Sequence, residues 1–463
     1  MEIPHHIKEA HKRLSNHSVK FLEFVQTDPE HVKRSNFQVL KWPRKYVTFQ
    51  PWPLFINQHL KNELMEAGRS VTKLVKNIPG QFFGWNPKKI SAYFELSLET
   101  ITDALKGATD AHIHNLLARG DFAFSPTSGF KCIEFNVSGN LGGWELPFWQ
   151  SMYLQTPTVS TFFEENNIKM RNANLLSVVL EHFIDRMVET FPHCKDEMNM
   201  AIVMTTHGDG TNHSPVERYA IRKYNHLLKR KNKHLAGELI VCNYPHLQVQ
   251  GDYLYYGGKK VLSIEENYGG KVPPDILDVF QKGNLLVYNG PVTDIMSNKL
   301  NIALLSEHEN SDIFTAGERE MIKKYIPWTR KTVRGKTTFE GKTIDLEKFV
   351  LSHKEKLVLK PASEYGGKGI LIGFNTLQKQ WEESVRNAFQ EKAWLVQEYI
   401  EPYAYLFQEG EEGCSEHHSV WGIFMFGDSY GGCFIRTLPK KNNKGIINSK
   451  QGAETSIIFE VEE

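Results

Sequence analysis

Lysines and glycines suited to binding phosphate gather in one stretch of the chain, residues 357–373. Residues 357–360 have the pattern of a buried strand that ends in Lys360, and a turn at Pro361 follows. Glycines allow backbone N–H groups to approach phosphate oxygens closely, and lysines supply the matching positive charge. The loop residues that we assign to phosphate binding are Gly366, Gly367, Lys368 and Gly369. Taken alone, the stretch also fits an ordinary β-hairpin with a glycine turn.

Oxygen ligands suited to magnesium occur at three positions. Glu134 and Asn136 are two residues apart in a segment, 131–136, that has the pattern of a strand. Residues two apart on a strand point to the same face, so this carboxylate and this amide would lie side by side. Glu364, beside the glycine loop, adds a second carboxylate, and such hard oxygens are the ligands that magnesium takes. A solvent-facing polar pair on an edge strand would show the same spacing as Glu134 and Asn136.

Two arginines are candidates for binding an anionic substrate. Arg119 lies just before the 131–136 strand, and Arg436 is at the end of a predicted strand near the C-terminus. A guanidinium binds a carboxylate or a phosphate through two parallel hydrogen bonds, and α/β sheets usually place site residues at strand ends. By itself, Arg119 would equally fit a surface ion pair with Asp121, which would contribute little to stability.

Two further segments fit a bound nucleotide. Lys299 lies at the start of a predicted helix, 297–306, where a positive side chain opposes the helix dipole unless an anion is bound. Residues 396–402 begin as an apolar strand and end in polar residues. An extended backbone there can offer a carbonyl and an N–H to an adenine edge, with a carboxylate near the ribose. The residues of this segment that we assign to the nucleotide are Gln397, Glu398 and Tyr399.

The order of these motifs along the chain resembles that of the eukaryotic-type glutathione synthetases and the related glutathionylspermidine synthetases. Both are ATP-grasp ligases with a circularly permuted chain order. In that family an E-x-N strand, matched here by Glu134 and Asn136, supplies two magnesium ligands. A K-P-x-x-E-G-G loop, matched here in residues 360–367, supplies the third ligand and covers the phosphates. The resemblance consists of motifs in a shared order and is not continuous.

The resemblance implies roles for the remaining candidates. Lys299 would bind phosphate, Arg119 and Arg436 would hold the acid substrate, and Ser138 would contact that substrate. The glycine loop departs from the family pattern, because it lacks a run of three glycines. We expect Lys368 to take over a phosphate contact there.

Alternating helices and strands must position these residues. Apolar residues at helical spacing predict helices over 58–75, 97–118, 175–190, 215–229, 297–306 and 377–389. Apolar runs predict strands over 131–136, 198–205, 238–242, 284–288, 357–360, 370–372 and 394–400, and a hairpin of 419–426 with 432–436. The strand, helix and strand between residues 198 and 242 predict a βαβ unit with parallel pairing.

The resemblance implies an α/β (α+β) protein with a circularly permuted ATP-grasp fold and an inserted βαβ substrate domain. We expect four parts along the chain. They are an N-terminal helical or irregular cap (1–95), a first part of the core with the Glu134 and Asn136 strand (96–195), the βαβ substrate domain (196–295) and the nucleotide-binding part (296–463).

The function that follows is an ATP-dependent carboxylate–amine ligase. With ATP and Mg²⁺, it would convert an acid to an acyl phosphate, which an amine attacks, with release of ADP and phosphate. The acid and the amine would be small molecules such as amino acids or short peptides. Two alternatives stay open: an ATP-grasp phosphotransferase that forms no amide, and an inactive nucleotide-binding partner protein.

The composition limits the other classes of function. The 463 residues carry a net charge of +1, which gives no electrostatic footprint for nucleic acid. No apolar run reaches the roughly 18 residues of a membrane span. The five cysteines lack C-x-x-C spacing, which suits free thiols in the cytoplasm. A homodimer is one assembly open to such a chain.

Overall fold

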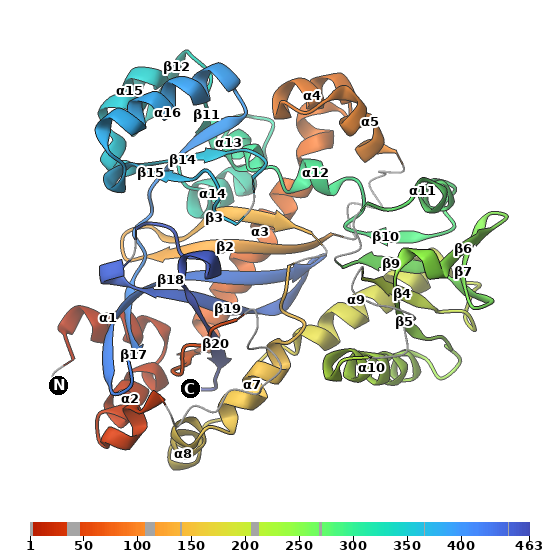
Figure 1. Ribbon diagram of the computed structural model, residues 1–463, viewed down its shortest axis with the longest axis horizontal. Helices are drawn as coiled ribbons and strands as arrows, with labels where there is room; N and C mark the ends of the chain where they lie inside the picture. Colours follow the sequence, from red (N-terminus) through yellow and green to blue (C-terminus); the bar gives the residue numbers. More distant parts are fainter. Residues whose placement is uncertain are drawn as a thin grey trace.

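The computed structural model describes residues 3–34, 47–106, 116–138, 141–204, 213–267, 271–364, 366–442 and 444–463. Within these ranges the chain is a mixed α/β protein, as the predicted alternation of helices and strands indicated. Figure 1 shows a large central sheet, with one smaller unit above it and another to its right. None of the helices in the described ranges is both long and apolar enough to cross a membrane.

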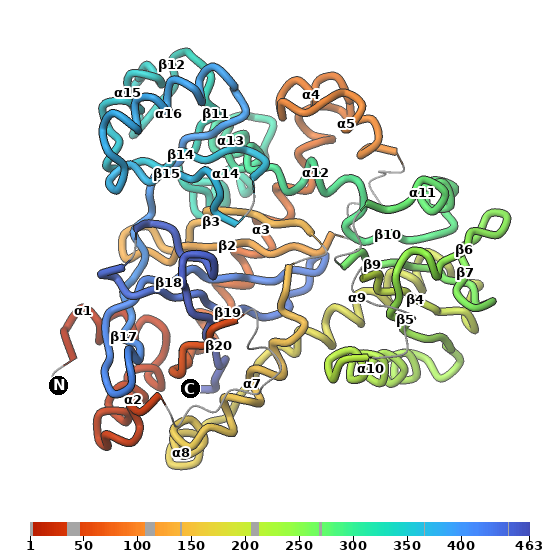
Figure 2. The backbone as a smooth tube through the Cα atoms, in the orientation of Figure 1, coloured from red at the N-terminus to blue at the C-terminus, as the bar shows by residue number. Residues whose placement is uncertain are grey.

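The central sheet has seven strands in the described part of the chain. In order across the sheet they are β1 (Leu54–Ile56), β20 (Glu454–Glu460), β19 (Ser429–Pro439), β18 (Gly413–Phe426), β2 (Leu117–Ser125) and β3 (Gly129–Val137), and β17 (Ala404–Glu409) also pairs with β18. Strands β1 and β20 run parallel, and the other neighbours run antiparallel. The sheet therefore brings the two ends of the chain close together (Figure 2), where the His17 N–H donates to Glu463 at 3.0 Å.

Helices cover the central sheet. The long helix α3 (Gln58–Phe83) packs on β2, β18 and β19, and Gly68 lets it approach closely, because a Cβ there would lie 2.8 Å from the Met425 sulfur. The other helices around this sheet are α1 (His5–Leu14), α2 (Asn16–Val25), α7 (Leu146–Leu154), α8 (Pro157–Glu165) and α9 (Leu175–Thr190).

A parallel sheet forms the unit on the right of Figure 1. Its strands, in order, are β10 (Leu286–Tyr288), β9 (Ser263–Glu266), β4 (Met200–Val203) and β5 (Leu239–Cys242). Helix α10 (Pro215–Lys231) joins β4 to β5, and Ser214 and Glu217 form a capping box at its start. The predicted βαβ unit is therefore present. Strands β6 (Leu247–Gln250), β7 (Tyr253–Tyr256) and β8 (Lys259–Val261) form a small separate sheet, and α11 (Pro274–Gln281) precedes β10.

An antiparallel sheet forms the upper unit. Its strands, in order, are β11 (Thr329–Lys331), β16 (Trp394–Glu398), β14 (Leu357–Pro361) and β15 (Leu371–Ile372). Helices α15 (Leu346–Ser352) and α16 (Gln378–Glu391) and the hairpin β12 (Lys336–Phe339) with β13 (Lys342–Asp345) complete it. Trp381 and Phe389 are buried in an apolar cluster confined to this unit, so it has a core of its own.

Five short helices complete the described chain. They are α4 (Pro87–Phe94), α5 (Leu98–Leu105), α12 (Thr293–Met296), α13 (Leu300–Glu307) and α14 (Ala316–Tyr325). Two predicted elements end elsewhere than expected. The helix predicted over 97–118 stops at Leu105, and Ala118 already lies in β2, because it pairs with Val137 of β3. Arg436 is not at a strand end, since pairing with β18 extends β19 to Pro439.

Candidate active site

A cavity of about 540 Å³ lies between the central sheet and the upper antiparallel sheet. The predicted site residues that line it are Arg119, Glu134, Asn136, Ser138, Lys360, Gly366, Gly367, Gln397, Glu398, Tyr399 and Arg436. The remaining candidates lie next to these residues. Lys299 contacts Glu134, Lys368 contacts Glu364, and Gly369 packs on Pro361. Residues from distant parts of the chain therefore meet at one place.

Two arginines share one buried carboxylate at one end of the cavity. Asp121 is only 2% exposed. Arg119 donates from Nε to Asp121 Oδ1 at 2.8 Å and from Nη2 to Oδ2 at 3.1 Å. Arg436 Nη2 lies 2.8 Å from the same Oδ2. The Arg119–Asp121 pair is therefore part of a buried cluster, and the surface ion pair that the spacing also allowed is wrong.

The charge state of this cluster is fixed. Burial by itself would raise the pKa of Asp121, but the charges and hydrogen bonds of Arg119 and Arg436 outweigh it and lower the pKa to about 2. Asp121 is thus ionised at neutral pH. Arg436 Nε is buried without a hydrogen-bond partner among the described residues. A buried donor left unpaired costs about 1–3 kcal/mol, so an acceptor from a ligand would be stabilised there.

Strand geometry explains how the cluster forms. Arg119 and Asp121 are two apart on β2 and share a face, whereas Arg436 lies on β19, with β18 in between. The β18 residue opposite Asp121 is Gly422. Its missing side chain leaves space for the neighbouring groups, because a Cβ at Gly422 would lie 2.5 Å from the Phe434 ring and 3.2 Å from Arg119 Cδ.

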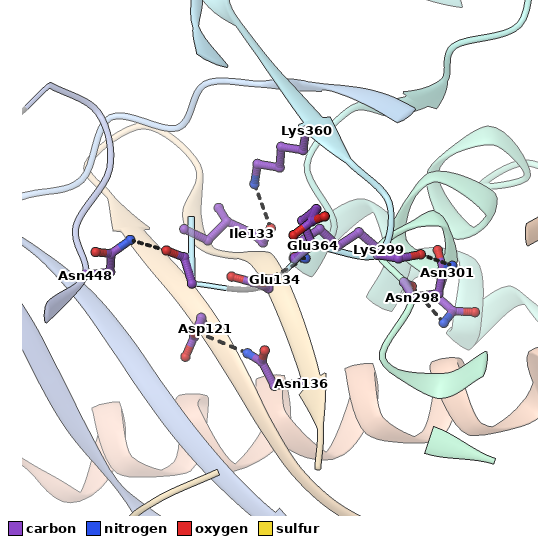
Figure 3. A network of polar contacts seen from close by, with 12 residues as sticks. Asp121, Ile133, Glu134, Asn136, Asn298, Lys299, Asn301, Lys360, Glu364 and Asn448 are labelled. Carbon is purple, nitrogen blue, oxygen red and sulfur yellow. Dashed lines mark hydrogen bonds and ion pairs between the residues drawn. The ribbon is translucent and has the colours of Figure 1, made fainter. Parts of the chain in front are cut away.

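Lys299 stands between the two predicted acidic ligands (Figure 3). Its Nζ lies 3.1 Å from Glu134 Oε1 and also donates to the backbone carbonyl of Glu364. The Glu364 carboxylate instead pairs with Lys368, at 3.1 Å. The Glu134 carboxylate and the Glu364 backbone carbonyl therefore share one ammonium group, although their segments are far apart in the sequence, and the two carboxylates contact different lysines.

The oxygens around Lys299 suit a divalent cation. The ammonium group shows that a positive charge is accommodated where Glu134 and Glu364 meet. Asn136 donates from Nδ2 to Asp121 Oδ2 at 3.2 Å, which turns its carbonyl oxygen away from Asp121. Hard oxygen donors of this kind are those that magnesium takes. Across the described ranges there is no group of three or more His, Cys, Asp or Glu side chains that could hold a metal, so the magnesium site stays a prediction.

Lys360 reaches the cavity from the upper sheet. Its Nζ donates to Gln397 Oε1 at 2.6 Å and to the Ile133 carbonyl at 2.9 Å. Ile133 is the extra residue of a β-bulge in β3, since Asp121 pairs with Glu134 and the next residue of β2 with Cys132. Burial lowers the pKa of Lys360 to about 8; the nearby Glu134 opposes this shift and Lys299 adds to it.

Two loops meet beside the cavity. Asn448 Nδ2 donates to the Gly366 carbonyl at 3.3 Å, and the backbone of Gly366 also lies close to Lys450. Gly366, Gly367 and Gly369 all have positive φ angles, between 66° and 77°, which other residues adopt only with strain. The stretch 442–448 stands out in the sequence as polar and basic after Arg436, but Asn448 was not predicted as a site residue. Its contact depends on which loop lies opposite, and the local pattern does not contain that information.

Apolar side chains from both sheets also line the cavity. They include Ile133, Val358, Ile370, Ile372, Ile400, Val420 and Ile446. The Glu398 N–H donates to the Trp328 carbonyl and the Tyr399 N–H to the Lys356 carbonyl, both at 2.8 Å. These two N–H groups are therefore not available to an adenine edge, so only other groups of this segment could meet the base. Burial raises the pKa of Glu398.

Comparisons with known proteins give limited information. No family model matches the sequence, and no curated protein matches it. Among solved structures, one match is a protein described as a proposed gamma-glutamylcysteine synthetase from Methylobacillus flagellatus KT. It is 12% identical over 85% of this chain and 87% of that chain, with a TM-score of 0.36.

Proposed function

We propose that the protein is an ATP-dependent carboxylate–amine ligase with a circularly permuted ATP-grasp fold. The proposal needs one site for a nucleotide triphosphate and an adjoining site for an acid. The cavity offers both kinds of group. Lysines and a glycine loop lie around Glu134, and an arginine cluster lies around Asp121.

One observation carries the proposal. Asn136 Nδ2 is 3.2 Å from Asp121 Oδ2, so the predicted metal ligand and the arginine cluster are joined by a hydrogen bond. An acid held by Arg119 and Arg436 would therefore lie next to phosphates held by Lys299 and Lys360. Bringing a carboxylate and a phosphoryl group together in a fixed orientation is the main requirement for making an acyl phosphate.

The chemistry needs no nucleophilic side chain. A carboxylate oxygen of the acid would attack the terminal phosphorus of ATP, which forms the acyl phosphate and releases ADP. The amine would then attack the acyl carbon, forming the amide, expelling phosphate and losing a proton. Lys299, Lys360 and the N–H groups of residues 366–369 would neutralise the transferring phosphoryl group. Magnesium, held by Glu134, Asn136 and Glu364, would supply further neutralisation.

The test is ADP release from the purified full chain. ATP and Mg²⁺ would be combined with a panel of amino acids and short peptides, singly and in pairs. A ligase releases ADP in proportion to a new amide, and only when acid and amine are both present. ADP release with a single acceptor would instead indicate a phosphotransferase. ATP binding without any ADP release over the whole panel would contradict the proposed activity.

A further inference from the structure

We infer that Asp121 is a positioning and specificity residue, which fixes both arginines of the acid site and restricts that site to a singly charged carboxylate. The inference rests on the proposed function, in which Arg119 and Arg436 hold the acid. Asp121 lines the cavity, but its oxygens already accept from Arg119, Arg436 and Asn136, so we expect it to act on the acid through the two arginines.

The orientation of Arg119 follows from its partners. Asp121 occupies the edge of the guanidinium formed by Nε and Nη2. Nη1 donates to the Leu141 carbonyl at 2.5 Å. A second carboxylate can therefore approach Arg119 only through the edge formed by Nη1 and Nη2. A planar fork held in this way presents a single geometry to the substrate.

Arg436 is fixed by the same carboxylate. Its Nη2 bonds to Asp121 Oδ2, which also accepts from Arg119. The positions of both guanidinium groups are therefore set by the same oxygen atom. Both arginines also lie over the Phe434 ring, with distances to its centroid of 5.8 Å for Arg119 and 5.9 Å for Arg436. Without the Asp121 carboxylate, the positively charged guanidinium groups of Arg119 and Arg436 would repel each other, and no group between them would fix the distance that separates them.

Asp121 also sets the charge of the acid site. Two guanidinium groups and one carboxylate leave one positive charge in excess. Of the charged groups beyond the cluster, Glu134 pairs with Lys299, and Lys360 is assigned to the phosphates of the nucleotide, so the positive charge left for the acid is that of the arginine cluster. A single carboxylate neutralises the excess, whereas a dianion would leave a negative charge in a largely buried place, which is unfavourable.

The experiment compares Asp121→Asn with the wild-type chain in two measurements. Steady-state ADP release gives kcat and KM for the acid, and thermal shift with inorganic sulfate reports binding of a dianion without any turnover. We expect kcat to fall about tenfold or more, because the arginines lose their common anchor. We also expect sulfate to bind about tenfold more tightly, because a negative charge has been removed. The Kd of MgATP should stay within about twofold of the wild-type value, since the phosphate-binding groups are retained.

Glu454→Gln is the matched control, because Glu454 pairs with Arg34 outside the cavity lining. It should change neither kcat nor sulfate binding. Unchanged kcat and unchanged sulfate binding in Asp121→Asn would overturn the inference. Tighter sulfate binding by Asp121→Asn, with no ADP release from the wild type under any condition, would support the role of Asp121 and reject the proposed ligase.

Asp121→Glu covers the case in which Asp121→Asn does not fold. This variant keeps the charge and moves the carboxylate by one methylene group. Lowered kcat with unchanged sulfate binding would support the inference, since position would be lost and charge retained. Wild-type kcat in a folded Asp121→Glu chain would overturn it.

Discussion

Most charged residues in and beside the cavity have a partner of opposite charge. Lys299 is paired with Glu134, Lys368 with Glu364, and both arginines with Asp121. Binding of a cation by Glu134 therefore requires Lys299 to find another anion, and the phosphates of the nucleotide would provide it. In the proposed ligase this exchange would link the binding of magnesium to the binding of the nucleotide, because a buried charge is unfavourable without its partner.

Replacing Arg436 by lysine tests the acid site at a single residue. Lysine keeps the charge but cannot bridge Asp121 and a substrate with one planar group. We expect turnover to fall about tenfold or more, which corresponds to about 1.4 kcal/mol of transition-state stabilisation. The Kd of ATP, measured by calorimetry, should hardly change. Arg34→Lys, away from the cavity lining, is the control. Normal turnover in Arg436→Lys would mean that Arg436 does not position the acid.

The pKa of Lys360 predicts a pH dependence of ATP binding. Burial lowers this pKa to about 8, so the side chain is charged below pH 8 and becomes neutral above it. ATP affinity should therefore weaken as the pH rises from 7 to 9, up to about tenfold, because one unit above the pKa leaves about a tenth of the side chains charged. Calorimetry at several pH values measures the trend. In Lys360→Met the dependence should disappear. If the ATP affinity of Lys360→Met still fell with rising pH as in the wild type, a group other than Lys360 would be responsible for the pH dependence.

Among the secondary-structure elements, three adjacent strands position the proposed acid site. Strands β2 and β19 carry the arginines, and β18 between them contributes a glycine at the point of closest packing. The bulge in β3 turns the Ile133 carbonyl to Lys360, so one irregularity connects the central sheet to the upper sheet. The site therefore depends on strand pairing as much as on the functional side chains.

Gly422→Ala tests this packing. A Cβ at Gly422 would lie 2.5 Å from the Phe434 ring and press on Arg119, so the chain must shift. Overpacking of this kind costs about 1–3 kcal/mol, which denaturant unfolding would measure. Gly431→Ala is the matched control, because its Cβ would lie 2.5 Å from the Phe426 ring, outside the cavity lining. Both variants should be destabilised, but only Gly422→Ala should raise the KM of the acid. Equal KM values in the two variants would contradict the account of Gly422.

Across the whole molecule, the sequence pattern predicted where helices and strands lie better than it predicted which strands pair with one another. The β4–α10–β5 unit and the β14–β15 hairpin lie where the sequence predicted them, because their apolar spacing and turn residues are local. The β1–β20 pairing was not predicted, because it joins opposite ends of the chain. Strand β9 was also missed. It follows three short strands of a different sheet, and its own run of residues is too short to show a period.

The same limit applies to the site. Residues 134, 136, 299, 360, 364 and 436 were singled out from their types and order, and the structure places them in or beside one cavity. Asp121 was interpreted as one half of a surface pair, because burial depends on which strands lie alongside, and spacing does not reveal that. Asn448 was missed for the same reason. What a sequence pattern can predict is the chemistry of the residues, whereas their partners follow from the fold.

Nucleotide binding should join the two sheets that enclose the cavity. The glycine loop belongs to the upper sheet, and the segment with Asn448 follows β19 of the central sheet. Lys368 is 74% exposed on its side chain, so trypsin can reach it when the loop opens. MgATP that binds the closed loop should slow this cleavage about tenfold at ten times its Kd, because the open population falls with ligand occupancy. Cleavage after Lys259, in the separate β6–β7–β8 sheet, should keep its rate. Equal cleavage at Lys368 with and without MgATP, under conditions where calorimetry shows ATP bound, would mean that this loop does not cover the phosphates.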